Sequence, residues 1–389
     1  MKESGRIKVL HIANTDFFFY YLLLEKLTAL KTKGLEVQLL SPPGRYKKLL
    51  EERGFIVTYL PISRKINIFH DVLSIIRLTR FIKKNGFQIV HTHTGKGGFV
   101  GRLSAWLAGV PVILHTIHGF SFYEGQNWYS YHLAKLSEWV CGMISYRVFF
   151  QNREDFQEVK RSRLISPSKA RYIGNGVNIQ HIMNEGRMGK MRNFREELQL
   201  DRSSRVIGFF ARLEAIKRHE FFLRAFPAVV KKLPNTVCLI AGEGPLEGRL
   251  RSLTQKLKID RNVRFLGFRD DAKQLITACD LIVLPSYREG IPRILLEAMI
   301  NEKAVVTTDV KGNREVVDNY RNGILVSPHD YNLFSRIMID LLKDGIMREK
   351  MGKSGRKKVL REFDERRVII RLLREYTQVI SHRLEKSEK

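Results

Sequence analysis

Short apolar runs alternate with longer stretches of helical periodicity along nearly the whole chain. Runs such as 8–13, 37–40 and 112–115 are apolar and bounded by polar residues, which predicts short buried strands. Between such runs, stretches such as 68–84 and 129–145 repeat apolar residues every three or four positions, which predicts amphipathic helices. This order of strands and helices favours a parallel sheet that is covered by helices on both faces.

The alternation stops once, over residues 178–204, and then resumes. That segment is polar and mixed in charge, so it reads as a linker with a short helix. Strand-like runs return at 206–210, and the last stretch, 365–384, has the apolar spacing of one helix. The sequence therefore predicts an α/β fold of two doubly wound, Rossmann-like domains, with ligands at the carboxyl ends of the strands. The predicted segments are an N-terminal domain at 1–180, a linker at 181–204, a second domain at 205–365 and a C-terminal helix at 366–389.

The composition is that of a globular protein. The 389 residues are 44% hydrophobic and 28% charged, which suffices for two packed cores and excludes a disordered chain. The three cysteines, Cys141, Cys238 and Cys279, do not form a CxxC pair or a Cys/His cluster. We therefore expect a reducing compartment and neither a disulfide framework nor a structural zinc site.

Two stretches bear on the cellular location. The start, Met1–Arg6, leads directly into a strand-like run without a signal-peptide pattern. Residues 103–123 lack Lys, Arg, Asp and Glu and are long enough to cross a bilayer, but Gly109–Pro111 interrupts them. We read this stretch as a helix, a turn and a buried strand. We expect a cytoplasmic protein that associates at most peripherally with the inner face of the cell membrane.

The chain is strongly basic, with 68 Lys and Arg against 40 Asp and Glu and a net charge of +28. The excess is spread over both halves, so it does not form a binding tail. Nucleic acid, an anionic membrane surface and an anionic substrate are all compatible with it. The predicted helix at 68–84 carries Arg77, Arg80, Lys83 and Lys84 and is a candidate for contact with anionic headgroups, although packing against the sheet explains its pattern equally well.

The densest group of candidate site residues follows a predicted strand in the second half. A loop carries Glu289 and Gly290, Pro292 suits the first turn of a helix, and Glu297 lies one turn further on. The start of such a helix offers unpaired backbone N–H groups at 290–293 and the positive end of the helix dipole, and both favour a phosphate or a sugar oxygen. By spacing alone, a solvated loop charge and an ordinary helix residue explain the two glutamates equally well.

Glu289 and Glu297, with seven residues between them, resemble the E-x7-E motif of the retaining, nucleotide-sugar-dependent glycosyltransferases of family four, which have the GT-B fold. Several further segments resemble that family in the expected order. In the second half they are Ala211–Lys217, Ile240–Pro245, Val263–Gly267, Gly312–Glu315 and Asn322–Val326. In the first half they are His91–His93, Gly109–Val112, Thr116–Gly119 and Gly174–Val177, a set that looks most like enzymes building capsule, exopolysaccharide or O-antigen units on a lipid carrier.

The resemblance implies two Rossmann-like domains that face each other across a cleft, with the C-terminal helix crossing back to the first domain. It also implies retaining transfer of a sugar from UDP-hexose or UDP-N-acetylhexosamine to a lipid-linked or cell-surface polysaccharide precursor. Glu297 would hold the ribose hydroxyls, Glu289 the sugar, and His118 would lie across the cleft near that sugar. The residues implied to catalyse are Glu289, His118, Arg212 and Lys217. Those implied to bind the nucleotide-sugar are Arg212, Lys217, Gly242, Gly244, Gly290, Ile291, Pro292, Arg293 and Glu297.

The residue types suit this reaction. Negative charge grows on the β-phosphate as the nucleoside diphosphate leaves, and Arg212 and Lys217, just after a predicted strand, can neutralise it. The sequence contains no Asp-x-Asp pair that would clamp a metal ion, so we expect no metal and no other cofactor. Outside the motif, the two cations would read as ordinary surface charges, and His118 as a core histidine.

Two segments depart from the family pattern. Most relatives carry a Gly-Gly turn after the first strand, where this chain has Ala13–Phe18, so we expect this loop to serve the acceptor. Arg218 stands where a glycine often follows the lysine. Two other functions remain open: a nucleotide-sugar epimerase or another GT-B enzyme such as a phosphorylase, and a basic nucleic-acid-binding protein, for which no recognised binding motif accompanies the charge.

Overall fold

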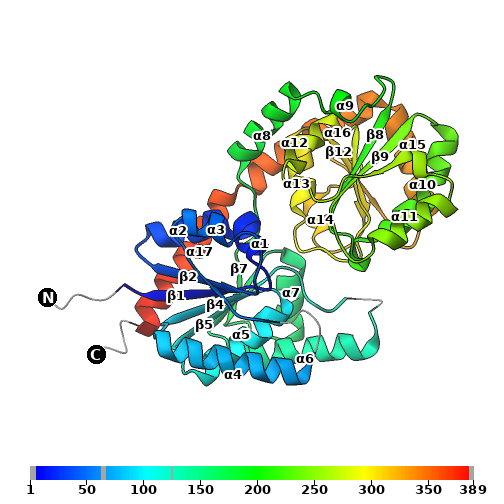
Figure 1. Ribbon diagram of the computed structural model, residues 1–389. Coiled ribbons are helices and arrows are strands. Elements are labelled where there is room, and N and C mark those ends of the chain that lie inside the picture. Colours follow the sequence, from blue (N-terminus) through cyan, green and yellow to red (C-terminus); the bar gives the residue numbers. More distant parts are fainter. Residues whose placement is uncertain (1–5, 63–66, 124–125, 385–389) are drawn as a thin grey trace. The chain divides into compact units, whose positions relative to one another are not determined.

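The protein folds into two compact units, which the computed structural model describes at residues 6–62, 67–123 and 126–384. The first unit comprises 1–174 and 367–389, and the second 175–366. Each contains one parallel sheet with helices on both faces, so the predicted fold class is confirmed (Figure 1). Residues 1–5, which bear on the predicted absence of a signal peptide, lie outside the described residues.

The first unit is built on a seven-stranded parallel sheet with the order β3-β2-β1-β4-β5-β6-β7. The chain adds β2 and β3 on one side of β1 and then continues on the other side with β4. The point between β1 and β4, where the direction reverses, is where ligands bind in doubly wound sheets. The strands are β1 (Lys8–Ile12), β2 (Glu36–Ser41), β3 (Ile56–Tyr59), β4 (Ile89–His93), β5 (Val112–Ile117), β6 (Arg147–Phe150) and β7 (Ala170–Tyr172).

Helices cover both faces of this sheet (Figure 1). On one face, α2, α3 and α17 pack over residues such as Val9 and Leu39, and α17 contributes Leu372 and Tyr376 to that core. On the other face, α4 and α5 pack over the residues that alternate with these, such as Leu10. The helices are α1 (Asp16–Phe18), α2 (Leu24–Thr32), α3 (Lys47–Glu52), α4 (Ile68–Asn85), α5 (Gly95–Leu107), α6 (Trp128–Ile144), α7 (Arg153–Ser162) and α17 (Glu365–Val379), with π-helical segments at Phe19–Leu23 and Ile380–Leu384.

The second unit repeats the design with a six-stranded parallel sheet in the order β10-β9-β8-β11-β12-β13. Here the direction reverses between β8 and β11. The strands are apolar along their length, as expected for a sheet buried on both faces. They are β8 (Arg205–Phe210), β9 (Thr236–Ala241), β10 (Val263–Phe265), β11 (Leu281–Leu284), β12 (Ala304–Thr308) and β13 (Ile324–Val326).

The segment predicted as a linker, 181–204, lies within the second unit and is largely helical. Ile182 and Phe194 are buried in the core of that unit, which ties the segment to it despite its polar composition. The helices of the unit are α8 (Ile179–Met191), α9 (Phe194–Glu197), α10 (His219–Lys232), α11 (Glu247–Lys256), α12 (Ala272–Leu275), α13 (Arg293–Ile300), α14 (Asn313–Val316), α15 (Tyr331–Lys343) and α16 (Gly345–Glu362), with short 3-10 helices at Ala215–Lys217, Asp260–Asn262 and Ile276–Ala278.

The charge-free stretch at 103–123 comprises the end of α5, a turn and β5, as predicted. Gly109 adopts the left-handed conformation with φ 73°, which allows the chain to leave the helix and enter the strand. Among the described residues, none of the helices combines the length and the apolar character needed to cross a bilayer.

Candidate active site

Four loops of the second unit meet at the carboxyl ends of the central strands. They follow β8, β9, β11 and β12, and the loops after β8 and β11 flank the point at which the strand order reverses. The loop after β8 carries Arg212 and Lys217, and the loop after β11 carries Glu289 and Gly290. Doubly wound sheets bind their ligands at such a crossing point, and here it brings together residues from segments about 70 positions apart.

Lys217 and Glu289 form an ion pair between the loops after β8 and β11. The Lys217 Nζ atom lies 2.6 Å from Glu289 Oε1, and the two side chains are only 20% and 10% exposed. Partial burial strengthens such a pair relative to one in open solvent. A carboxylate accepts at both oxygens and an ammonium carries three N–H donors. The pair can therefore keep its mutual contact while Glu289 binds a hydroxyl and Lys217 binds a phosphate.

Glycines allow the loops to approach each other this closely. A Cβ atom on Gly242, whose φ is 148°, would lie 2.1 Å from the Ala211 carbonyl oxygen. A Cβ atom on Gly244 would lie 2.5 Å from the Leu213 carbonyl oxygen. Leu213 N also donates to the Glu243 carbonyl at 2.9 Å. Close packing of the loops after β8 and β9 is therefore the role that the structure gives to the two glycines predicted to bind the nucleotide-sugar.

A third glycine holds the loop that carries Glu289. A Cβ atom on Gly312 would lie 1.8 Å from the Gly290 carbonyl oxygen and 2.8 Å from that of Glu289. Gly312 itself has φ 76° and precedes α14. The first residue of α14, Asn313, donates from Nδ2 to Thr307 Oγ1 at 2.7 Å and to the Thr308 carbonyl at 2.8 Å, which fixes this turn on the end of β12.

Helix α13 begins at Arg293 and directs its N-terminus toward the same loop. Pro292 is its N-cap residue, one position earlier than the predicted first turn, and provides no side-chain cap. Ile291 and Pro292 are buried, and the Ile291 carbonyl accepts from Asn175 Nδ2 at 3.5 Å. Pro292 thus places no side-chain cap on the first backbone N–H groups of α13. An anion at a helix start binds to such uncapped N–H groups.

Glu297 lies in the second turn of α13, where loss of water raises the pKa of its carboxyl; the nearby charges of Lys273 and Arg293 act in the opposite direction. Among the described residues, its carboxylate has no hydrogen-bond partner. An acidic group in such surroundings favours a ligand that offers hydroxyl donors.

The raised pKa of Glu297 predicts a pH dependence of stability. The folded state holds this proton more tightly than the unfolded state, so the free energy of unfolding falls as the pH rises from 4.5 through the folded pKa. We expect Glu297→Gln to raise the melting temperature of the ligand-free protein at pH 7 and to leave it unchanged below pH 4.5. Thermal unfolding from pH 4 to 8 measures this. Glu302→Gln is the matched control because its side chain is 44% exposed, and coincident pH profiles of wild type and Glu297→Gln would contradict the prediction.

Arg212 extends from the loop after β8 into a more open position. Its side chain is 57% exposed, and Nη1 lies 2.7 Å from Glu214 Oε1. The structure places its backbone beside Gly242 but records no contact between its side chain and Glu289 or Glu297 among the described residues. Of the residues predicted to act on the donor, Lys217 and Glu289 are therefore in contact, and Arg212 is a neighbour from the same loop.

Arg218 and Tyr287 belong to this group of loops although no motif singled out the tyrosine. Arg218 adopts φ 57°, a left-handed conformation that explains why glycine suits this position. Its guanidinium lies 3.8 Å from the Tyr287 ring centroid and 4.2 Å from that of Phe221. Tyr287 N donates to the Ile216 carbonyl at 2.9 Å. These contacts join the Lys217 and Glu289 loops, and only the adjacency of β8 and β11 reveals them.

His118 belongs to the first unit, just after β5. It is half-buried, its Nε2 atom lies 3.2 Å from His93 Nδ1, and the edge of its ring meets the Phe18 ring at 4.7 Å. Loss of water and the nearby Lys26 ammonium lower its pKa to about 3, while a side-chain hydrogen bond with Gln151 acts in the opposite direction. His118 is therefore a neutral imidazole at pH 7, able to donate at one nitrogen and accept at the other.

The loop after β1, which lacks the expected glycines, is held by Asp16. Its carboxylate accepts from Phe17 N and Tyr46 N, both at 2.8 Å, and from Tyr59 Oη at 2.9 Å. A Cβ atom on Gly44 would lie 2.0 Å from Asp16 Oδ1, so Gly44 permits this arrangement. The loop is thus ordered by side-chain hydrogen bonds, and its expected role toward the acceptor stays a prediction.

Comparison with known proteins places these features in context. A family model described as Glycosyl transferases group 1 matches residues 190–358, and one described as Glycosyltransferase Family 4 matches 21–181. The chain is 30% identical to the UDP-Gal:alpha-D-GlcNAc-diphosphoundecaprenol alpha-1,3-galactosyltransferase of Escherichia coli, with 80% of each chain covered. It is 29% identical to the putative glycosyltransferase EpsD of Bacillus subtilis, with 93% of this chain and 94% of that protein covered. The crystal structure of Anabaena HepE in complex with UDP and glucose is similar with a TM-score of 0.79 at 18% identity, covering 96% of this chain and all of that one.

Proposed function

The chain belongs to the family-four glycosyltransferases, and on that premise we propose that it moves a hexose or N-acetylhexosamine from a UDP-sugar to a lipid-linked polysaccharide precursor, with retention at the anomeric carbon and without a metal ion. It is an enzyme with the two Rossmann-like units of the GT-B fold. The observation that carries the site assignment is the Lys217–Glu289 ion pair at the reversal point of the second sheet.

The donor would bind at the four loops of the second unit. Its diphosphate would meet the Lys217 ammonium, the Arg212 guanidinium and the first N–H groups of α13, which together offer fixed positive charge. Glu297 would accept from the ribose hydroxyls, which gives its carboxylate the donors that the ligand-free protein does not supply. Glu289 would accept from a sugar hydroxyl through the oxygen that Lys217 leaves available.

In the reaction, the bond between the anomeric carbon and the β-phosphate oxygen breaks and its electron pair leaves with UDP. The charge that develops on the departing phosphate lies where Lys217, Arg212 and the α13 amides would stabilise it, so these groups bind the transition state more strongly than the ground state. An acceptor hydroxyl then attacks from the same face and passes its proton to the departing phosphate oxygen. No protein nucleophile is needed, and none is assigned.

A UDP donor and a lipid-linked acceptor are supported by two of the similar proteins. The Escherichia coli relative is named for transfer from UDP-Gal to a sugar on diphosphoundecaprenol. The Anabaena structure contains UDP. A polyprenyl diphosphate acceptor is both apolar and anionic, and a chain with a net charge of +28 suits its diphosphate and the membrane that holds it.

An exposed apolar stripe on α6 is the surface that we propose for contact with that membrane. Tyr129 is 77% exposed and Trp128 65%, and further apolar side chains recur every three or four residues along the helix. Such a stripe is unusual on a protein that contacts only water. Phe69, in the first turn of α4, is also 77% exposed, and α5 contacts both α4 and α6. The exposed residues of the α6 stripe are Trp128, Tyr129, Leu133, Leu136, Trp139 and Met143.

We expect Leu133→Ser combined with Leu136→Ser to reduce sedimentation with anionic vesicles by at least about tenfold. Each leucine that moves from water into the bilayer would contribute roughly 1.5–3 kcal/mol to binding. Sedimentation with vesicles of phosphatidylglycerol measures this at low and at physiological salt. Leu49→Ser is the control, because Leu49 is 40% exposed on α3, which lies on the other face of the sheet. Equal binding of the double variant and wild type would show that α6 does not contact lipid.

The proposed function is tested by donor binding followed by transfer. We expect UDP-sugars, and neither GDP- nor ADP-sugars, to raise the melting temperature, because only a ligand that binds the folded state shifts unfolding. Transfer of radiolabelled hexose to a polyprenyl diphosphate-linked monosaccharide, in the presence of EDTA, tests the reaction and its independence of metal. Consumption of the UDP-sugar without acceptor would indicate an epimerase, and loss of transfer in EDTA would overturn the metal-independent proposal.

A further inference from the structure

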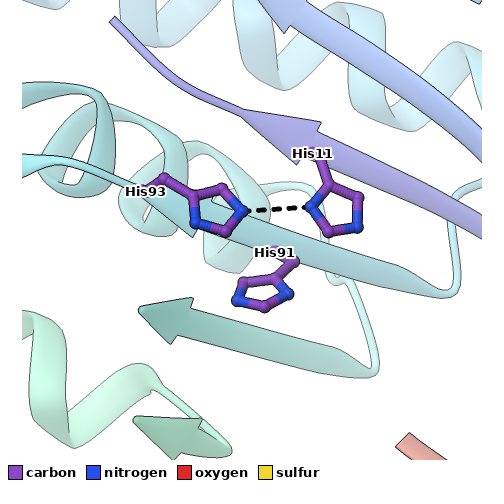
Figure 2. Close-up of side chains that lie close together, drawn as sticks. All are labelled: His11, His91 and His93. Atoms are coloured by element: carbon purple, nitrogen blue, oxygen red, sulfur yellow. Dashed lines mark hydrogen bonds between the residues drawn. The ribbon is translucent and has the colours of Figure 1, made fainter. Parts of the chain in front are cut away.

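A group of buried histidines lies in the first unit, at the point where the strand order reverses. His11 is on β1 and His91 and His93 are on β4, and all three side chains are at most 2% exposed. Figure 2 shows the three rings on the same side of these strands, with His11 and His93 joined by a hydrogen bond. Alternation along parallel strands explains this placement, because His11 pairs in register with His91, and His93 lies two residues further on the same face.

The histidines form one continuous series of hydrogen-bond contacts. His11 Nδ1 lies 3.0 Å from His93 Nε2, and His93 Nδ1 lies 3.2 Å from His118 Nε2. At the other end, the Tyr376 hydroxyl of α17 lies 2.7 Å from His91 Nδ1 and 3.4 Å from His11 Nε2. We use the term histidine chain for these residues. Its members are Tyr376, His91, His11, His93 and His118. The other ring nitrogen of His91, Nε2, lies 2.8 Å from Thr116 Oγ1.

The ring nitrogens of His11, His91 and His93 lie close enough to one another to suggest a metal site. The surroundings argue against it. The cavity at the cluster measures about 10 Å³, and the residues that line it include Lys26 but no acidic side chain. A divalent cation there would be buried with only neutral ligands beside a second cation, which is costly in a low-dielectric interior. Both His91 nitrogens already contact hydroxyl groups.

All four rings are neutral at pH 7. Burial lowers the pKa of His11 and of His118 to about 3 and lowers the pKa of His91 and His93 well below its usual value. A neutral imidazole carries one N–H group and one acceptor nitrogen. Where two such rings are hydrogen-bonded, one nitrogen donates and the other accepts. A ring that accepts at one nitrogen therefore donates at its other nitrogen, so the direction of each hydrogen bond fixes the direction of the next.

We propose that the histidine chain makes His93 a positioning residue that sets which nitrogen of His118 carries the proton. Two directions are consistent with one N–H per ring. In the first, every ring carries its proton on Nε2: His118 donates to His93, His93 donates to His11, and His11 donates to the Tyr376 hydroxyl. In the second, every ring carries it on Nδ1 and each of these hydrogen bonds is reversed.

We assign the first direction to the histidine chain, in which the Tyr376 hydroxyl donates at its shorter contact and accepts at its longer one. Its hydroxyl is 2.7 Å from His91 Nδ1 and 3.4 Å from His11 Nε2. In this direction Tyr376 donates to His91 and accepts from His11, and Nδ1 of His118 carries no proton. A side-chain hydrogen bond also joins His118 to Gln151. With the proposed function as premise, the tautomer fixes which ring nitrogen of His118 can accept from Gln151 or from a substrate hydroxyl.

Substitution of Tyr376, at the far end of the histidine chain, tests the assigned direction without changing His118. Tyr376→Phe keeps the ring in its core and removes only the hydroxyl, which is three hydrogen bonds away from His118. We expect the Nδ1–H form of His118 to increase relative to the Nε2–H form by about fivefold, because one hydrogen bond contributes about 1 kcal/mol. Long-range ¹H–¹⁵N spectra of ¹⁵N-histidine-labelled protein report each tautomer. We also expect kcat to fall by about the same factor, with KM for the UDP-sugar unchanged.

Thr92→Val is the matched control. Its hydroxyl also contacts a buried histidine, at 2.8 Å from His115 Nδ1, but on the opposite face of the same strand, against Gly98 of α5. The control should alter the His115 signals and leave His118 and kcat unchanged. Melting temperatures of both variants verify folding.

Three results would overturn the coupling along the histidine chain. They are unchanged His118 tautomers in Tyr376→Phe, an equal change in Thr92→Val, and one transition-metal ion per chain by elemental analysis of the purified protein. A shifted tautomer with unchanged kcat would overturn the positioning role. If wild type transfers no sugar at all, the proposed function fails. The tautomer measurement still decides whether Tyr376 and His118 are coupled through the histidine chain.

Discussion

Replacement of Glu289 by alanine is expected to reduce kcat for sugar transfer by about 100-fold or more, while UDP itself still binds within a few-fold of wild type. The carboxylate would hold the sugar in the reactive position, and a misplacement of about 1 Å is enough for a loss of that size. UDP has no transferred sugar, so its binding does not depend on Glu289. Steady-state transfer rates together with calorimetric titration of UDP measure the two effects.

Glu289→Gln separates charge from hydrogen bonding, because the amide keeps the size and one acceptor. We expect it to retain more activity than alanine but less than wild type, since it no longer pairs with the ammonium of Lys217. Glu220→Gln is the control: Glu220 also contacts a cation at 2.6 Å, Arg249, but that cation is 71% exposed at the surface. Near wild-type turnover by Glu289→Ala would remove the site assignment.

The second large effect is expected at Lys217, where methionine keeps the length of the side chain and removes the charge. We expect kcat to fall by about 10²–10³-fold, as for the loss of one donor that stabilises developing negative charge. UDP binding should weaken as well, because the ammonium would contact the diphosphate in the ground state. This combination distinguishes Lys217→Met from Glu289→Ala, which should spare UDP binding.

Lys358→Met provides a matched control in the same unit. Lys358 Nζ lies 2.6 Å from Asp318 Oδ1, the same distance as in the Lys217–Glu289 pair, and its side chain is 9% exposed. Loss of that pair should change the melting temperature and leave transfer intact. In the double variant Lys217→Met/Glu289→Ala, a rate no lower than the worse single variant would show that the two residues act as a unit. Unchanged kcat and UDP affinity in Lys217→Met would contradict its proposed contact with the diphosphate.

The two-unit α/β architecture follows from patterns that are local in the sequence. Apolar runs and helical periodicity are each set by residues within one element, so the strands at 8–13 and 236–241 could be assigned without knowledge of their neighbours. The polar segment at 181–204 was predicted as a linker because its apolar residues are few. The burial of Ile182 and Phe194 places it in the second unit, and burial depends on partners distant in sequence.

The sequence pointed to the residues that we propose for the site, but it did not predict which of them contact one another. The motif at Glu289 and Glu297 identified the loop and the helix, whereas the pairing of Glu289 with Lys217 depends on the adjacency of β8 and β11. Gly242 and Gly244 are predicted to bind the nucleotide-sugar, and the contact that the structure shows for both is a close approach to a neighbouring backbone. Tyr287 had no sequence signal at all, because a single aromatic residue has no periodicity.

The sequence by itself therefore determined the α/β order, the family and the charged residues that we propose for the donor site, since each of these is encoded in short, contiguous patterns. Only the tertiary structure decided which of those residues meet. His11 and His91 are 80 positions apart in the chain and become neighbours through strand register, and Tyr376 joins them from the last helix. The physical reason is that strand order and register arise from packing both faces of the whole sheet, and no local segment contains that information.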